Sequence, residues 1–360
     1  MLMSIQYHIP IVFSTNESWA PYVGVAVHSL CKKINPNDCY DIWVMHDGLS
    51  PEVMEELVKV TECYENVELN FRTLEKLQQE KLNNKNLHAI AYSYYRLWLG
   101  MLFPEYDRMI YLDVDVLLNA DIAELYRTDL GNALIGSVTD TSILKSLSLG
   151  ESALNPNIQL LEQLGIKDIR QYFNNGVLVL DLKRIREERR EDVLMKLLSR
   201  DTFFNHDQDI FNIAFFGFRK HLPVEWNFQF EPYLKDEPDT ARWKGTEFSD
   251  VPTIHKEKSW KILHLIESKP WDVNSKAVAN VVHGLLWWKT AFSMPSFQAH
   301  LKEVFDLSLK AVRKNLNQHQ WKIFCSFGHA RTKRKRRIKA LEEYLSMLEQ
   351  LADENGIRKY

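Results

Sequence analysis

The sequence has few cysteines and no long apolar run. Its four cysteines, Cys31, Cys39, Cys63 and Cys325, are scattered and form no CxxC pair. Since structural zinc sites and disulfide frameworks need closely or regularly spaced cysteines, we expect neither, and the pattern favours a reducing compartment. No stretch approaches the roughly 18 apolar residues that a membrane-spanning helix needs. Residues 1–10 lack the basic and apolar regions of a secretory signal peptide. These absences predict a cytoplasmic protein.

The chain also lacks an excess of charge of one sign. Its 45 basic and 48 acidic residues give a net charge of −3, which argues against polyanion binding by the chain as a whole. With 360 residues, 45% apolar and 26% charged, it has an ordinary globular composition, and it is long enough for one large α/β domain and an appendage. One segment departs from this balance, because residues 331–339 contain seven basic residues in nine.

Apolar runs of strand length alternate with helical patterns in the first three quarters of the chain. A strand–helix–strand–helix–strand order at the start predicts a parallel sheet with helices on its faces, and thus an α/β fold. The expected strands are 9–14, 42–46, 67–71, 109–112, 134–138, 177–182 and 262–266. The expected helices are 21–30, 51–64, 92–102, 208–216, 277–292 and 297–312. Because the composition changes after Trp271, we place a domain boundary near 275, between a domain at 1–275 and a helical, basic region at 276–360.

Two carboxylates follow the predicted strand at 109–112. Asp113 and Asp115 stand two residues apart where this strand ends, and ligands in α/β sheets lie at the carboxyl ends of strands. Both carboxylates can reach one ion there, and oxygen ligands suit Mg²⁺ or Mn²⁺, which in turn bind phosphate oxygens. The alternative is an ordinary turn with two solvated aspartates. The buried strand in front favours the metal site, because acids beside apolar residues need partners.

Amide and carboxyl side chains form two further clusters. Asn174 stands in Phe-Asn-Asn-Gly before the predicted strand at 177–182, and Asn side chains can bind sugar hydroxyls in fixed geometry. The glycine permits a close approach of the backbone, although Asn-Gly is also a common turn. Asp207 and Gln208 begin the predicted helix at 208–216. Asp207 is expected to cap that helix and also to accept a sugar hydroxyl.

The last cluster lies at the end of the predicted strand at 262–266. His264 there is able to complete a metal shell begun by two carboxylates, although a lone strand histidine is more often structural. Lys269 follows it and offers a cation to a phosphate group. A metal, a phosphate cation and partners for sugar hydroxyls would together form a site for a sugar nucleotide.

Six segments that contain these clusters resemble retaining glycosyltransferase family 8, which includes bacterial lipopolysaccharide galactosyl- and glucosyltransferases and glycogenin. The resemblance spans about Ile9 to Trp271, some three quarters of the chain. The segments occur in the family's order and are IVFSTNESWAPY, AYSYYRLWLG, YLDVDVLL, FNNGVLVLDL, HDQDIFN and HLIESKPW.

The resemblance implies a Rossmann-like GT-A fold, a UDP-sugar donor and Mn²⁺, with Mg²⁺ as the alternative. It implies that a hexose, glucose or galactose, passes with retained configuration to a glycan, glycolipid or glycoprotein. Asp113, Asp115 and His264 match the family's metal ligands, and Gln208 and Asp207 match residues around the transferred sugar. The expected donor contacts are Ser14 and Asn16 at uridine, Arg96 near the donor, Asp140 and Asn174 near the sugar, and Lys269 at the diphosphate. The sequence leaves open which hexose is used and which molecule accepts it.

Two departures from the family pattern affect the donor site. The family commonly has aspartate at position 16, where this chain has Asn16, so its contact with uracil is expected to differ. The segment from His264 to Trp271 is one residue shorter than usual and has no glycine. Glu267 in this shortened loop is expected to weaken, or even oppose, binding of the donor phosphates.

Three further interpretations concern activity and partners. The text LDVDVLL also fits a haloacid-dehalogenase phosphatase, although that motif usually lies on the first strand. A non-catalytic subunit that binds sugar nucleotides is the second alternative. The basic cluster at 331–339, with Trp287, Trp288 and Trp321, favours attachment to the inner face of a membrane over nucleic acid binding. A homo-oligomer remains open, since the helix after this cluster has apolar residues at helical spacing.

Overall fold

The computed structural model describes residues 7–74, 91–141, 156–200, 203, 205–229, 249–266, 269–272, 281–323, 326 and 328–357. These residues divide into two compact units, which are described separately. The first unit contains residues 1–229 and 237–264, and the second contains 230–236 and 265–360. The segment from Leu265 onward thus groups with the C-terminal helices, ten residues before the boundary expected near 275. The shortened loop's Glu267 lies outside the described residues.

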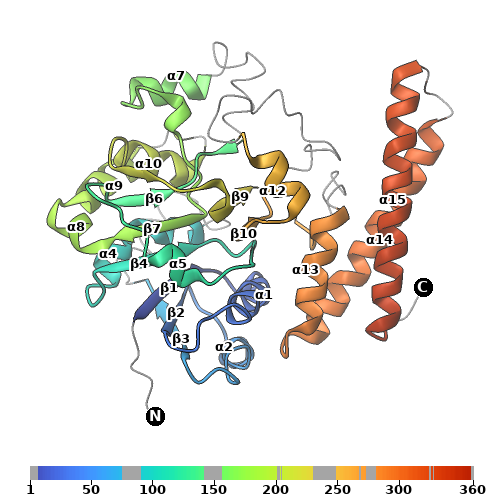
Figure 1. Ribbon diagram of the computed structural model, residues 1–360, viewed down its shortest axis with the longest axis horizontal. Coiled ribbons are helices and arrows are strands. Elements are labelled where there is room, and N and C mark those ends of the chain that lie inside the picture. The colour runs from blue at the N-terminus through green and yellow to red at the C-terminus, as the bar shows by residue number, and fades with distance from the viewer. Residues whose placement is uncertain are drawn as a thin grey trace. The chain divides into compact units, whose positions relative to one another are not determined.

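A seven-stranded sheet forms the centre of the first unit, in the order β3-β2-β1-β4-β7-β6-β8 (Figure 1). Strands β3, β2, β1 and β4 are parallel, as the sequence predicts. Strand β7 runs antiparallel to both β4 and β6, so the sheet is mixed rather than parallel throughout. The strands are β1 (His8–Ser14), β2 (Cys39–His46), β3 (Val67–Thr73), β4 (Arg108–Leu112), β6 (Ile135–Ser137), β7 (Val177–Asp181) and β8 (Arg219–His221).

Helices cover both faces of this sheet, with α8, α9 and α10 on one side and α1 and α2 on the other (Figure 1). Alternate strand residues such as Met109, Tyr111, Leu178 and Leu180 pack against the first group and form an extended apolar cluster with it. The helices of this unit are α1 (Ala20–Cys31), α2 (Pro51–Val58), α4 (Leu99–Leu102), α5 (Ile122–Tyr126), α7 (Pro156–Gln163), α8 (Leu182–Glu187), α9 (Arg190–Leu198), α10 (His206–Ala214) and α12 (Val251–Glu257). The 3₁₀ helices are η1 (Ala91–Trp98), η3 (Ile169–Gln171) and η4 (Val224–Asn227).

Three expected helices differ from those observed, and the one expected at 297–312 is α14 (Gln298–Ile323), which extends eleven residues further. The segment expected as one helix at 92–102 is a 3₁₀ helix, η1, followed by the short α4. The five consecutive residues Tyr94 to Trp98 are all buried, so this segment packs inward around most of its circumference. The second helix, α2, ends at Val58 rather than near 64, and turns occupy the remainder.

Of a second, three-stranded sheet, the sequence interpretation found one strand, at 262–266, and missed the other two, which are too short to leave a pattern. Strand β10 (Ile262–His264) lies between β5 (Val116–Leu118), to which it is antiparallel, and β9 (Phe228–Gln229). The strand expected at 262–266 is therefore shorter and ends at His264. This small sheet joins residues that are more than a hundred positions apart in the sequence.

The second unit consists of α13 (Val281–Ser293), α14 (Gln298–Ile323) and α15 (Gly328–Glu354). Helices α14 and α15 form an antiparallel hairpin, joined by an Arg313–Glu349 ion pair at 2.8 Å and by a Gln320–Glu342 hydrogen bond at 3.1 Å. The basic cluster 331–339 lies in the first half of α15. Among the described residues, no helix has the length and apolar character required to span a bilayer.

The assignment of Trp287 and Trp288 as interfacial aromatics is wrong. Both side chains are fully buried, and their rings stack within the helical unit. Trp287 packs on Trp271 with ring centroids 4.5 Å apart, and Trp288 packs edge-on against Phe305 at 4.9 Å. Burial of these large rings adds to a core of the helical unit that also contains Leu301, Leu309 and Leu348. Only Trp321 of the three is exposed, at 70%.

Candidate active site

Strand register brings the predicted metal ligands together. Asp113 directly follows β4, and β7 pairs antiparallel with β4, so the residue before β7 meets the residue after β4. The Asp113 amide accordingly donates to the Gly176 carbonyl at 2.7 Å. Antiparallel pairing of β10 with β5 then sets His264 opposite Val116, next to Asp115. Two antiparallel contacts therefore complete a site that begins at the end of a parallel strand.

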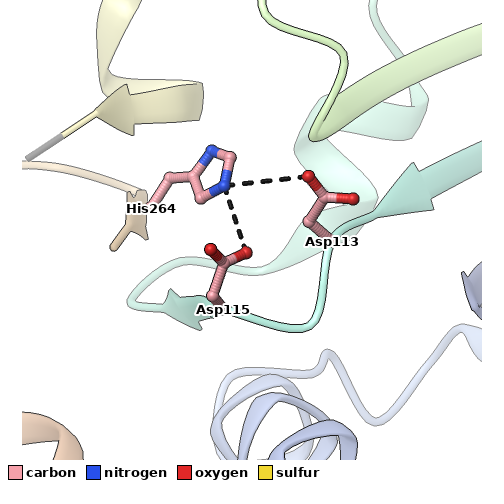
Figure 2. Close-up of side chains that lie close together, drawn as sticks. All are labelled: Asp113, Asp115 and His264. Carbon is pink, nitrogen blue, oxygen red and sulfur yellow. Dashed lines mark ion pairs between the residues drawn. The ribbon is translucent and has the colours of Figure 1, made fainter. Parts of the chain in front are cut away.

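Asp113, Asp115 and His264 form a compact group, with one ligand atom from each lying within 4.8 Å of the others. The His264 Nε2 atom is 3.1 Å from Asp115 Oδ1 and 3.8 Å from Asp113 Oδ2, as Figure 2 shows. His264 and Asp115 are buried, whereas Asp113 is partly exposed. Burial, and then the negative charges of Asp113 and Asp115, raise the pKa of the nearby Tyr92 to about 12.

The ring orientation of His264 is set by Asn227. The His264 Nδ1 atom lies 2.9 Å from Asn227 Oδ1, while Asn227 Nδ2 donates to Asn174 Oδ1 at 2.9 Å. Because the Asn227 oxygen only accepts, Nδ1 of His264 is the donor in this hydrogen bond. Nε2 is then the ring atom directed toward the two aspartates, which is the orientation that metal-bound histidines use.

Asp113 has its other oxygen fixed by a buried arginine and a tyrosine. Arg96 Nη2 donates to Asp113 Oδ1 at 2.8 Å, and the Tyr111 hydroxyl donates to the same oxygen at 3.0 Å. The Arg96 guanidinium, only 4% exposed, also lies over the Tyr111 ring at 4.2 Å. Oδ1 is thus occupied by the protein, and Oδ2 faces His264.

Asp207 lies on the far side of Arg96, and its role as a helix cap is not observed. Helix α10 already begins at His206, and Asp207 instead forms an ion pair with Arg96, with Oδ2 3.1 Å from Nε, and accepts hydrogen bonds from Ser93 Oγ at 2.9 Å and Asn175 Nδ2 at 2.7 Å. Burial raises the pKa of Asp207, while Arg96 lowers it. Because both of its oxygens accept from the protein, the structure favours a positioning role over direct contact with a sugar hydroxyl.

A network of amides and one carboxylate lies next to this group. Gln208 Nε2 donates to Asp140 Oδ2 at 3.1 Å, and Gln208 Oε1 accepts from the Asn175 backbone amide at 3.3 Å. Asn174 Nδ2 lies 3.4 Å from both Asp140 Oδ2 and Gln208 Oε1. Asn174 and Asp140 are buried, and Gln208 is partly exposed. Through Asn227, this network continues to His264.

Gly176 is required by the packing of the site. A Cβ atom at this position would lie 2.3 Å from His264 Cε1 and 2.5 Å from Asp113 Oδ2. Any side chain would therefore displace two of the three candidate ligands. The sequence predicted a close approach to this glycine, and the groups that approach it are the side chains of His264 and Asp113.

Ser14 and Asn16 have defined local contacts at the end of β1. The buried Ser14 hydroxyl lies 3.0 Å from the Tyr111 hydroxyl, which continues to Asp113. Asn16 Oδ1 accepts from the Trp19 amide at 3.1 Å and from Ser18 Oγ at 2.9 Å, a turn that starts α1. Their contact with uridine stays a prediction.

Lys269 belongs to the second unit, where its loop packs on the helices. Lys269 Nζ donates to the Leu265 carbonyl at 2.6 Å. The following residues are held by a hydrogen bond from Ser308 Oγ to the Pro270 carbonyl at 3.2 Å and by stacking of Trp271 on Trp287. The contact of Lys269 with a diphosphate stays a prediction.

Comparison with known proteins identifies the family. The sequence profile of glycosyl transferase family 8 matches residues 10–275, which is more than half of the chain. The chain belongs to glycosyl transferase family 8. The enzyme class predicted from the sequence, a glycosyltransferase, is thereby confirmed.

Individual proteins are also similar to most of the chain. General stress protein A of Bacillus subtilis is 22% identical over 74% of this chain and 88% of its own length. The lipopolysaccharide 1,2-glucosyltransferase of Escherichia coli strain K12 is 27% identical over 63% of this chain. That match covers 64% of the relative, so this chain spans less than two thirds of that protein's length.

Solved structures confirm the GT-A fold. The bifunctional glycosyltransferase WbbM superposes with a TM-score of 0.66 at 24% identity, over 82% of this chain and 51% of WbbM. The galactosyltransferase LgtC, crystallised with donor and acceptor sugar analogues, gives a TM-score of 0.61 at 22% identity. That match covers 82% of this chain and all of LgtC. Membership of family 8 leaves the phosphatase interpretation without support, and Asp113 follows the fourth strand rather than the first.

Several residues of the family 8 site were not found by sequence reasoning. Asn227, which orients His264, stands in Val-Glu-Trp-Asn without any motif. Tyr111 reads as an ordinary strand residue, and Ser93 as part of an aromatic helix. These residues act through contacts between distant segments, and no local pattern in the sequence indicates such contacts.

Proposed function

We propose that this family 8 chain transfers a hexose from a UDP-sugar, with retained configuration, in a reaction that requires a divalent cation at Asp113, Asp115 and His264. The observation that carries the proposal is the orientation of the His264 ring. Asn227 Oδ1 accepts a hydrogen bond from Nδ1, so that Nε2 is the ring atom that faces the two carboxylates and a cation between them.

The residues present fit a divalent cation. Two carboxylate oxygens and one imidazole nitrogen form a ligand set that suits Mn²⁺, with Mg²⁺ as the alternative. Their separations of up to 4.8 Å need only small side-chain movements to enclose one ion at about 2.1 Å. Arg96 pairs with Asp113 and Asp207, while Asp115 adds a further buried carboxylate that a cation would neutralise. Gly176 leaves the space that this geometry needs.

The remaining residues of the site suit a sugar diphosphate. Asn174, Asp140 and Gln208 present alternating donors and acceptors, the pattern that sugar hydroxyls require. Ser14 and Asn16 are proposed to contact uridine, and Lys269 to pair with the diphosphate. Arg96 and Asp207 hold Asp113 and Asn175 in place. The network through Asn227 ties the position of the sugar partners to that of the metal ligands.

The proposed reaction retains configuration without a protein nucleophile. A bound cation would neutralise the charge that develops on the diphosphate as its bond to the sugar breaks. Gln208 is the residue best placed for the anomeric carbon, but an amide is a poor nucleophile. We therefore favour attack by the acceptor hydroxyl on the face that UDP leaves, with Gln208 and Asp140 supporting positive charge on the sugar ring.

A lipid-linked glycan is our preferred acceptor. This choice rests on likeness to the lipopolysaccharide 1,2-glucosyltransferase of Escherichia coli. Free glycans and glycoproteins are the alternatives, and self-glucosylation is a special case, because the chain has 14 tyrosines.

Release of UDP tests the proposal directly. With water as a slow acceptor, we expect Mn²⁺-dependent release from either UDP-glucose or UDP-galactose, and none in EDTA. The anomeric proton of the liberated sugar, followed by NMR before mutarotation, should show the configuration of the donor. Release that is unaffected by EDTA would contradict the metal requirement, and an inverted sugar would contradict retention.

Replacement of Asn227 tests the role of the His264 ring orientation. Asn227→Leu is expected to lower Mn²⁺ affinity roughly 10- to 100-fold, because outer-shell partners of metal-bound histidines contribute on this scale. Asn227→Asp keeps an acceptor for Nδ1 and should lose less, although it no longer donates to Asn174. Calorimetric titration with Mn²⁺ measures both. Equal affinities in the wild type and Asn227→Leu would show that the ring orientation does not matter.

A further inference from the structure

The second unit contains a long segment without acidic residues. Residues 307–341 include 11 lysines and arginines and no aspartate or glutamate. The other 34 basic residues and all 48 acidic residues lie elsewhere, so the remainder of the chain has a net charge of −14. This segment comprises the second half of α14 and the first half of α15, and is therefore a structural feature of the helical hairpin rather than of the cluster 331–339 alone.

Cations from the two helices converge at one end of the hairpin. The contacts Arg313–Glu349 and Gln320–Glu342 show that α14 and α15 are antiparallel. Residues 331–339 therefore lie at the same end of the hairpin as the last turns of α14. His319 of α14 lies close to cations of both helices. Burial, and then the charges of Arg337, Arg334 and Lys322, lower its pKa. The like charges come from both helices, and their mutual repulsion favours an anionic partner.

An exposed tryptophan accompanies these charges. Trp321 is 70% exposed, the largest exposed fraction among the large apolar side chains in the described part of the chain. It lies at the end of a hollow of about 630 Å³ along one face of α14, whose lining extends from Lys310 to Lys322 and contains no acidic residue. Tryptophan beside lysine is typical of the membrane–water interface, where the ring lies among headgroups and the cations meet phosphates.

We propose that this end of the α14–α15 hairpin binds the surface of an anionic membrane, with Trp321 as the inserted side chain. The charge of the segment selects the partner, and the exposed ring distinguishes a lipid surface from a purely electrostatic one. Nucleic acid is less suited, because no described element forms a known nucleic-acid module around these cations. The inference does not depend on the proposed donor or metal.

Flotation of the full chain with vesicles tests the proposal. We expect binding to phosphatidylcholine vesicles that contain one third phosphatidylglycerol, and none to phosphatidylcholine alone. Two double variants remove cations from the two helices: Lys314→Gln/Lys322→Gln in α14, and Lys335→Gln/Arg336→Gln in α15. Each double variant should bind roughly tenfold or more weakly, since each cation contributes about a fivefold factor. Trp321→Ser should weaken binding and abolish the blue shift of tryptophan fluorescence on addition of vesicles.

The matched control removes two exposed lysines from the first unit. Lys183→Gln/Lys196→Gln changes the net charge by the same amount and should leave flotation unchanged. Metal-dependent UDP release without vesicles is measured for every variant and should stay at the wild-type value, which separates this proposal from the proposed reaction. Three results would overturn it: no flotation of the wild type, an equal loss in the control pair, or tight binding to duplex DNA with none to vesicles.

Discussion

Gly176→Ala is expected to abolish metal-dependent UDP release, although it adds a single methyl group. The new Cβ would lie 2.3 Å from His264 Cε1 and 2.5 Å from Asp113 Oδ2, both far inside van der Waals contact. His264 is held by Asn227 and Asp113 by Arg96, so neither can withdraw without losing a hydrogen bond. We expect the rate to fall more than roughly 100-fold and the free energy of unfolding by about 1–3 kcal/mol.

A neighbouring glycine provides the control. In Gly136→Ala, the new Cβ would lie 3.0 Å from Leu130 Cδ2 and 3.1 Å from Leu222 Cδ2, which are the ends of adaptable side chains. This substitution should cost comparable stability and leave UDP release near the wild-type value. Thermal unfolding and Mn²⁺ titration of both variants separate loss of the site from loss of the fold. Wild-type turnover in Gly176→Ala would show that His264 and Asp113 are not needed in the observed arrangement.

Asp115→Asn is expected to have an equally large effect, for an electrostatic reason. The substitution preserves size and removes the charge of a carboxylate that lies 3.1 Å from His264 Nε2. An amide oxygen is a weaker ligand for Mn²⁺ than a carboxylate, so metal affinity and turnover should both fall more than roughly 100-fold. Binding of UDP without metal should change little, because Asp115 then makes no attractive contact with the nucleotide.

Asp107→Asn is the matched control, since its side chain is 76% exposed and lies outside the site. It should leave Mn²⁺ affinity and UDP release unchanged. If Asp115→Asn retained Mn²⁺-dependent turnover, the DxD assignment would be wrong. If it lost turnover but kept Mn²⁺ affinity, the carboxylate would act on the donor rather than on the metal.

Much of the chemistry of the site was predictable from the sequence, because it is encoded locally. An apolar strand followed by Asp-Val-Asp already indicates two carboxylates at a sheet edge. Asn174, Gln208 and His264 each stand beside a predicted strand or helix, and the structure brings them together with Asp140. The parallel strands β1 to β4 were predicted for the same reason, since β–α–β units are local in sequence.

The contacts that orient these residues were not predictable, because they join segments far apart. Asn227 belongs to η4 and orients a histidine 37 residues away. Asp207 looked like a helix cap, whereas Arg96, 111 positions earlier, supplies its partner. Trp287 and Trp288 looked interfacial, but stacking on Trp271 and Phe305 buries them. In each case a tertiary contact overrides a local preference.

The sequence by itself determined which chemical groups are available, the family to which they belong and the parallel half of the sheet, because side-chain type and hydrophobic period are local properties. Only the tertiary structure decided the antiparallel pairing of β7 and β10, the ring orientation of His264 and the space at Gly176. These depend on which segments pair across the fold. Such pairings are set by the packing of the whole domain rather than by any one segment.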